Sequence, residues 1–193
     1  MSLRMGSLAG CAALLLFAGA AKADPIDYIF TGTGTGTLNG TAFRGSFTVT
    51  EVANTSGITF GGGEYRNTPS SATFTAGVLT ANLINPLIIE NTTAPGFMGF
   101  AEGAAPFPDE SLINSVFETY GLATSLASTT GTLSVAPATF ATSVGDLDFT
   151  TITALSFQAT LLTTVPEPSS VILLSSMLLA VAFVVRKRLA QGL

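Results

Sequence analysis

Carboxylates are the side chains of this chain with the greatest potential for chemistry. The sequence has no histidine, and its one cysteine, Cys11, lies close to the N-terminus. These absences exclude a Ser-His-Asp triad, an imidazole base and a histidine metal ligand. Two pairs of acidic residues remain as candidate sites. Asp146 and Asp148 could bind calcium, and Glu102 and Glu110 could serve glycoside hydrolysis.

Each acidic candidate also has a structural explanation. Gly145 and Asp146 are typical of a turn, and two aspartates supply fewer oxygens than the six to eight that calcium requires. Nothing in the spacing of Glu102 and Glu110 distinguishes them from other acids in a loop rich in Gly, Ala and Pro. We therefore predict a protein that is not an enzyme, with no cofactor and no metal; Asp146 and Asp148 are only weak candidates for a metal site.

The most unusual local pattern is the run Thr31 to Thr37, in which threonine and glycine alternate. Its glycines do not follow the Gly-x-Gly-x-x-Gly pattern of a phosphate-binding loop. In a strand, the glycines share one face and the threonines the other. The pattern predicts either a strand packed closely against a neighbour or a flat surface that accepts a sugar chain or a partner strand.

Residues 24–164 have the size of one domain that can bury a core without disulfides. This segment holds two basic and eleven acidic residues, a net charge of −9. Such a balance makes binding to nucleic acid phosphates or to anionic lipid unfavourable. We expect no nucleic acid partner.

The composition of this segment favours β-structure, because threonine, valine and phenylalanine are frequent and lysine and glutamate are rare. Asn39-Gly40 predicts a tight turn between strands at 26–38 and 41–51. Phe43, Phe47 and Val49 fall on one face of the second strand. A closing hairpin is predicted at 140–161, with Thr151 and Thr153 on the same face as Leu147 and Leu155.

Between these hairpins we expect strands at 71–80, 82–90 and 131–135, with Asn85-Pro86 interrupting the second or marking an edge. Residues 94–109 are expected to form a loop, and 110–127 a short helix capped by Asp109. The pattern as a whole predicts an all-β fold, an antiparallel jelly-roll-like β-sandwich. A signal helix and a single transmembrane helix are expected to flank it.

The N-terminal residues 1–23 have the features of a secretory signal peptide. Arg4 precedes an apolar stretch from Leu8 to Ala21, and Ala21-Lys22-Ala23 forms an A-x-A cleavage site. Signal peptidase would act after translocation by the Sec translocon, and the mature chain would begin at Asp24. The alternative is a lipoprotein signal at Leu8-Ala9-Gly10-Cys11, which would make Cys11 a lipidated N-terminus, but the apolar stretch before Cys11 is short.

Residues 165–193 form a second targeting segment. Val165-Pro166-Glu167-Pro168-Ser169 precedes an apolar run from Val171 to Val185, and Arg186-Lys187-Arg188 follows. The run is at the short end of a membrane-spanning helix, and the three cations predict a cytoplasmic C-terminus.

This tail resembles the PEP-CTERM sorting signal of Gram-negative bacteria that make extracellular polysaccharide. The resemblance covers roughly the last 25 residues. It implies that a membrane enzyme of the exosortase type cuts near Pro166-Glu167-Pro168. The chain would be exported across the inner membrane, held as a transient single-pass intermediate, and then placed at the cell surface or outside the cell.

Three roles are compatible with these targeting signals. The first is a structural or adhesive component associated with exopolysaccharide. The second is a carbohydrate-binding sandwich. Tryptophan is absent from the chain and tyrosine is limited to Tyr28, Tyr65 and Tyr120, whereas sugar-binding surfaces usually need exposed aromatic faces. The third is a plain membrane anchor that holds a periplasmic domain at the inner membrane.

Overall fold

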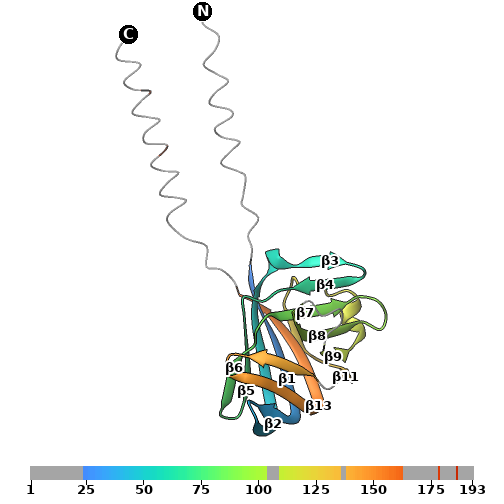
Figure 1. The fold of residues 1–193 in the computed structure, drawn as a ribbon. Helices are drawn as coiled ribbons and strands as arrows, with labels where there is room; N and C mark the ends of the chain where they lie inside the picture. Colours follow the sequence, from blue (N-terminus) through green and yellow to red (C-terminus); the bar gives the residue numbers. More distant parts are fainter. Residues whose placement is uncertain (1–23, 104–108, 136–137, 163–177, 179–185, 187–193) are drawn as a thin grey trace, which may run out of the picture. The chain divides into compact units, whose positions relative to one another are not determined.

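The computed structural model describes residues 24–103, 109–135 and 138–162, together with Leu178 and Arg186. The first unit consists of two antiparallel sheets, and in Figure 1 the strands of one sheet run across those of the other. Sheet A has the order β10-β13-β1-β2-β5-β6, with β12 also paired to β13; sheet B has the order β11-β9-β8-β7-β4-β3. The prediction of an all-β, antiparallel fold is confirmed.

The strand bounds show how the chain passes repeatedly between the sheets. In sheet A they are β1 (Pro25–Leu38), β2 (Thr41–Asn54), β5 (Ser71–Ala76), β6 (Leu79–Asn82), β10 (Leu126–Thr130), β12 (Thr139–Thr142) and β13 (Gly145–Leu161). In sheet B they are β3 (Thr59–Gly61), β4 (Glu64–Asn67), β7 (Pro86–Asn91), β8 (Phe97–Glu102), β9 (Glu110–Ile113) and β11 (Thr132–Val135). Two short 3-10 helices, Thr55–Gly57 and Ser115–Glu118, complete the described elements.

The N-terminal hairpin forms where the sequence predicts it. Asn39 and Gly40 both have positive φ, 48° and 74°, as the tight hairpin turn requires. β1 and β2 pair without a register shift from Pro25↔Asn54 to Leu38↔Thr41.

The closing hairpin differs from the prediction in its alternation. The register between β1 and β13 shifts twice, between Thr33 and Gly34 and between Thr35 and Gly36. At each shift β13 carries an extra residue, so its inward-facing positions change phase. Thr151 and Thr153 are therefore exposed, while Ile152 and Leu155 are buried. The prediction that Thr151 and Thr153 share the face of Leu147 is wrong.

The middle of the chain contains more strands than predicted. The expected strand at 71–80 is a hairpin, because Gly77 (φ 59°) turns the chain between β5 and β6. Pro86 begins β7, which confirms that Asn85-Pro86 interrupts the strand predicted at 82–90. β8 occupies part of the segment predicted as a loop, and the strand predicted at 131–135 is present as β11.

The helix predicted at 110–127 is wrong. Residues 110–113 pair with β8 on one side and β11 on the other, which places Leu112 in the core. These distant partners outweigh a mediocre helix propensity. Asn114 then caps a single 3-10 turn, and Gly121 (φ 79°) and Leu122 (φ 60°) adopt left-handed conformations incompatible with a helix.

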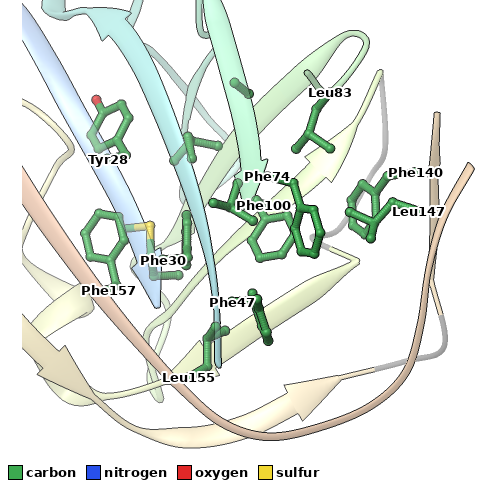
Figure 2. Close-up of a cluster of buried hydrophobic side chains, with 14 of the residues drawn as sticks. Tyr28, Phe30, Phe47, Phe74, Leu83, Phe100, Phe140, Leu147, Leu155 and Phe157 are labelled. Atoms are coloured by element: carbon green, nitrogen blue, oxygen red, sulfur yellow. The ribbon is translucent and has the colours of Figure 1, made fainter. Parts of the chain in front are cut away.

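Phenylalanine dominates the apolar core between the sheets (Figure 2). Phe30 of β1 lies at ring-centroid distances of 5.0 Å from both Phe100 of β8 and Phe157 of β13. Phe47 and Phe149 lie 4.9 Å apart in a tilted arrangement. Such aromatic pairs add stabilisation beyond that of the buried area alone.

A second unit begins at Thr163, and of it only Leu178 and Arg186 are described. The predicted cleavage residues Ala21 and Ala23, the motif Val165 to Ser169, and Lys187 and Arg188 lie outside the described residues. Within the described residues, no helix has the length and apolar character needed to cross a membrane.

Candidate functional site

The alternating Thr-Gly run places its glycines inside the fold and its threonines outside. Gly32, Gly34 and Gly36 are buried, and Thr31 and Thr33 are exposed. A Cβ atom on Gly34 would lie 2.3 Å from the carbonyl oxygen of Thr151. The bulged strand β13 therefore leaves no room for a side chain, and the prediction of a closely packed strand is confirmed.

The outward threonines of β1 belong to a larger surface on sheet A, which we call the hydroxyl face. One row of it crosses six hydrogen-bonded strands and carries a threonine or serine at every position. The row consists of Thr130 (β10), Ser156 (β13), Thr31 (β1), Thr48 (β2), Thr75 (β5) and Thr80 (β6). The neighbouring hydroxyl residues of the face are Thr33, Thr35, Ser46, Thr50, Thr73, Thr151 and Thr153.

Some hydroxyl groups of this face bind one another. The Oγ1 atoms of Thr33 and Thr153 lie 2.9 Å apart, and those of Thr35 and Thr151 lie 2.8 Å apart. In the central row, Ser156 Oγ donates to the carbonyl oxygen of Thr31 at 3.2 Å. The hydroxyl groups of Thr31, Thr48 and Thr75 have no partner among the described residues, so they are available to a ligand.

Charged and aromatic side chains are scarce on the hydroxyl face. Among its described residues none is aromatic. The charged residues Asp27, Arg44, Asp146 and Asp148 pair at positions outside the central row. A surface hollow of about 290 Å³ adjoins the face at the β1–β2 and β5–β6 turns, with Arg44 and Ser46 in its lining. The centre of the face is therefore neutral and rich in groups that both donate and accept hydrogen bonds.

Both predicted calcium candidates take part in hydrogen bonds within the fold. Asp148 accepts hydrogen bonds from Thr139 Oγ1 at 2.5 Å and Thr37 Oγ1 at 3.4 Å. Asp146 is exposed, and its carbonyl oxygen accepts the N–H of Asn39 at 2.7 Å. In the described part of the chain no group of three or more acidic, histidine or cysteine side chains is arranged to hold a metal ion.

Glu102 and Glu110 lie near each other on adjacent strands, since Phe100 pairs directly with Glu110. Glu102 Oε2 accepts the N–H of Ala141 at 2.7 Å and so joins β8 to β12. Burial raises the pKa of Glu110 to about 8, with a contribution from the charge of Asp109. Glu102 is thus held in a structural contact, and Glu110 is buried in the interior.

Sequence reasoning missed a buried polar cluster at the other end of the fold. Tyr28 Oη donates to the carbonyl oxygen of Leu122 at 2.8 Å and accepts from Asn67 Nδ2 at 3.0 Å. Glu90 Oε1 accepts the N–H of Gly121 at 3.0 Å. Glu51 pairs with Tyr28 across the β1–β2 ladder, and neither of its carboxyl oxygens has a partner.

Burial controls the ionisation of these acids. It raises the pKa of Glu51 to about 8 and that of Glu90 to about 7, although backbone hydrogen bonds to Glu90 act in the opposite direction. Burial also raises the pKa of Tyr28 to about 12. Glu51 is fully buried and keeps its proton at neutral pH. The protonated form costs less to bury than a carboxylate that has no counter-charge nearby.

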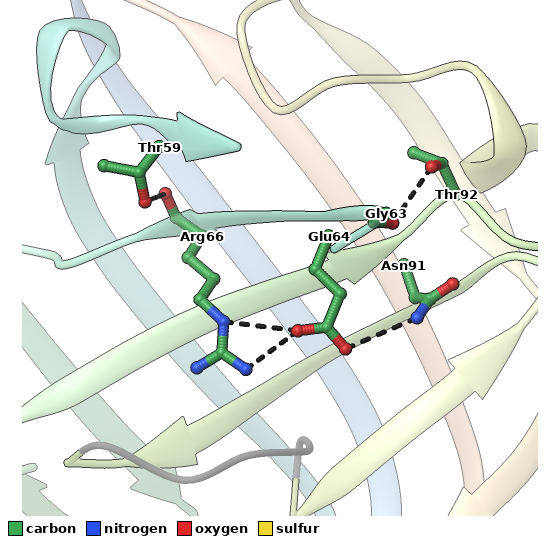
Figure 3. Close-up of polar contacts among 6 residues, drawn as sticks. All are labelled: Thr59, Gly63, Glu64, Arg66, Asn91 and Thr92. Atoms are coloured by element: carbon green, nitrogen blue, oxygen red, sulfur yellow. Dashed lines mark hydrogen bonds and ion pairs between the residues drawn. The ribbon is translucent and has the colours of Figure 1, made fainter. Parts of the chain in front are cut away.

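Strand β4, next to the edge strand β3 of sheet B, carries an ion pair (Figure 3). Arg66 Nη2 and Glu64 Oε2 lie 2.8 Å apart on β4. Asn91 Nδ2 of β7 donates to the other carboxyl oxygen of Glu64 at 3.3 Å. The Asn91 contact joins the β3–β4 hairpin to β7.

No protein-family model, curated protein or solved structure matches this chain. The hydroxyl face is the feature of the described fold that is most suited to contact a ligand. Its chemistry is that of multiple neutral hydrogen bonds, since the acidic groups with raised pKa values are inside the fold.

Proposed function

We propose that this chain is an exported protein, sorted by an exosortase-type enzyme, that serves without catalysis as a structural or adhesive component associated with exopolysaccharide. The observation that carries this proposal is the uninterrupted row of threonine and serine across six strands of sheet A. A neutral hydroxyl surface on an acidic domain suits contact with hydrated polymers outside the cell.

The targeting segments support the location. The signal peptide predicted at residues 1–23 would carry residues 24–164 across the inner membrane. The segment Val165 to Arg188 would then hold the C-terminus in the cytoplasm until the exosortase acts. The final site would be the cell surface or the extracellular space.

The architecture supports a role in contact. We infer a jelly-roll-like sandwich from the repeated passage of the chain between two antiparallel sheets that share one aromatic core. The glutamates with raised pKa values, Glu51, Glu90 and Glu110, are buried, so the outer surface does not present them to a ligand. The outer surface of sheet A is then the part that meets other molecules.

The intact mass of the protein from its native host tests the proposal, with the exosortase gene present and deleted. We expect a chain that starts at Asp24 and ends near Pro166 only when the gene is present. The variant Glu167→Ala should retain the full tail, while the matched variant Glu118→Ala in the ectodomain should be processed normally. A chain that reaches Leu193 in both strains would instead indicate an inner-membrane anchor with a periplasmic domain.

A further inference from the structure

We propose that the hydroxyl face binds a single chain of a neutral polysaccharide laid across the strands of sheet A. This inference rests on the proposed extracellular function and names the class of its partner. It is carried by the spacing, chemistry and charge of the row from Thr130 to Thr80.

The spacing of the row suits a polymer of sugars. Neighbouring strands in a sheet are about 4.8 Å apart, so six strands present a hydroxyl row about 24 Å long. The interval between strands is close to the length of one pyranose unit in an extended chain. A polysaccharide lying along the row would therefore meet one threonine or serine for each sugar.

The hydroxyl groups suit this partner chemically. Each threonine or serine hydroxyl can donate one hydrogen bond and accept others, as each sugar hydroxyl can. A single such bond contributes little because it replaces a bond to water. Binding therefore requires many bonds at once, and the stiff χ1 of β-branched threonine reduces the entropy lost when they form.

Charge selects a neutral polymer over an acidic one. The central row carries no charged side chain. The segment around it has a formal net charge of −9, which stays negative even when the buried Glu51, Glu90 and Glu110 keep their protons. An acidic polysaccharide would be repelled by this field. The same repulsion opposes the pairing of two copies of the chain through their hydroxyl faces.

The shape of the sheet favours a flexible chain over a flat solid. Antiparallel sheets twist, and the row turns with the strands that carry it. A single polymer chain can follow such a curved row, whereas the surface of a crystal touches it at only a few positions. Soluble polysaccharides are therefore the appropriate probes.

Affinity gel electrophoresis of the full chain in neutral detergent tests the inference. The gels contain hydroxyethylcellulose, laminarin or dextran as neutral polymers and alginate as the acidic one. The first variant, T31V/T48V/T75V, removes three hydroxyls and keeps β-branched side chains. The matched control, T59V/T93V/T132V, makes the same change at exposed threonines outside sheet A. A second variant, T48E, places a larger charged group in the middle of the row, and thermal melting monitors the fold of all of them.

We expect at least one neutral polymer to retard the wild type and the control, and alginate not to. T31V/T48V/T75V and T48E should each weaken the binding at least tenfold. Absence of retardation by every polymer, equal retardation by alginate, or unchanged binding of both variants would overturn the inference. A dimer in sedimentation velocity that both variants abolish would also overturn it and assign the face to self-association. If no polymer binds but the protein is processed correctly in the host, the proposed function stands and this inference fails. If a neutral polymer binds but the protein is neither exported nor processed, only the proposed function is rejected.

Discussion

Tyr28 of sheet A and Asn67 of sheet B form a hydrogen bond between the two sheets, with 3.0 Å from Asn67 Nδ2 to Tyr28 Oη. Asn67 Nδ2 also donates to the carbonyl oxygen of Asn54 at 3.2 Å. Because Tyr28 in turn donates to Leu122, one phenol connects β1, β4 and the segment after the second 3-10 helix. This contact fixes the relative position of the sheets where the aromatic core ends.

Replacement of Tyr28 by phenylalanine should therefore destabilise the protein by about 1–3 kcal/mol, because the buried carbonyl of Leu122 loses its donor. Urea unfolding of wild type and Y28F measures the difference. Y65F is the matched control, since the Tyr65 hydroxyl has no hydrogen-bonding partner among the described residues and should change stability by less than about 0.5 kcal/mol. Equal effects of the two substitutions would show that the Tyr28 contact contributes nothing specific.

The buried Glu51 should make the protein more stable in acid than in alkali. Its pKa rises from 4.5 to about 8 on folding, so the folded state keeps a proton that the unfolded state releases. This contribution to stability is fully present below about pH 4.5 and is lost progressively as the pH rises to about 8. Glu90 and Glu110, whose pKa values are also raised, act in the same direction.

The variant E51Q isolates this effect, because glutamine has a similar size and does not titrate. The unfolding free energy of wild type should fall by a few kcal/mol between about pH 5 and about pH 9, and that of E51Q should fall less. At the alkaline end E51Q should be the more stable protein. The exposed substitution D146N should leave the wild-type profile unchanged, and a wild-type profile that is flat or rises with pH would contradict the expectation.

The sequence was informative where structure depends on near neighbours. The first hairpin follows from Asn39-Gly40 and from the alternation of Phe43, Phe47 and Val49, all of which act within a few residues. Glu51 lies in phase with these apolar positions, so its burial was also open to inference. Glu90 was less accessible to inference, because it follows three consecutive buried residues in β7 and no alternation distinguishes its face.

Features that depend on distant pairing were not predictable in this way. The two bulges of β13 insert extra residues, and only the register against β1 shows where. Residues 110–113 become a strand because β8 and β11 flank them. The alternating threonines of β1 fall on one face by the period of a strand, but their alignment with Thr48, Thr75 and Ser156 depends on the pairing of four strands.

Substitution of Gly34 by alanine tests the close packing of β1 against the bulged strand. The new Cβ would lie 2.3 Å from the carbonyl oxygen of Thr151, so the backbone of β1 or β13 must move. We expect a loss of about 1–3 kcal/mol in the free energy of unfolding. G61A is the control, because a Cβ there meets no atom within 4 Å, and it should be neutral or slightly stabilising. A neutral G34A would mean that β13 does not approach β1 as the structure indicates.

Two glutamates allow a direct comparison between an ion pair within one strand and a contact between sheets. Glu64 pairs with Arg66 on β4, where both side chains are partly exposed, and such pairs contribute about 0–1 kcal/mol. Glu102 instead accepts the N–H of Ala141, and its loss leaves this backbone group without a partner at a cost of about 1–3 kcal/mol. E102A should therefore destabilise the protein more than E64A, although only Glu64 is in a salt bridge.

Salt separates the two mechanisms further. Added sodium chloride should reduce the effect of E64A, because it screens the exposed pair, and should change the effect of E102A little. Urea unfolding of both variants at low and high salt provides the measurement, and E102Q, which keeps an acceptor oxygen, should recover part of the loss. If E64A proves the more damaging substitution, the contacts of Glu64 on β4 contribute more to stability than the contact between β8 and β12.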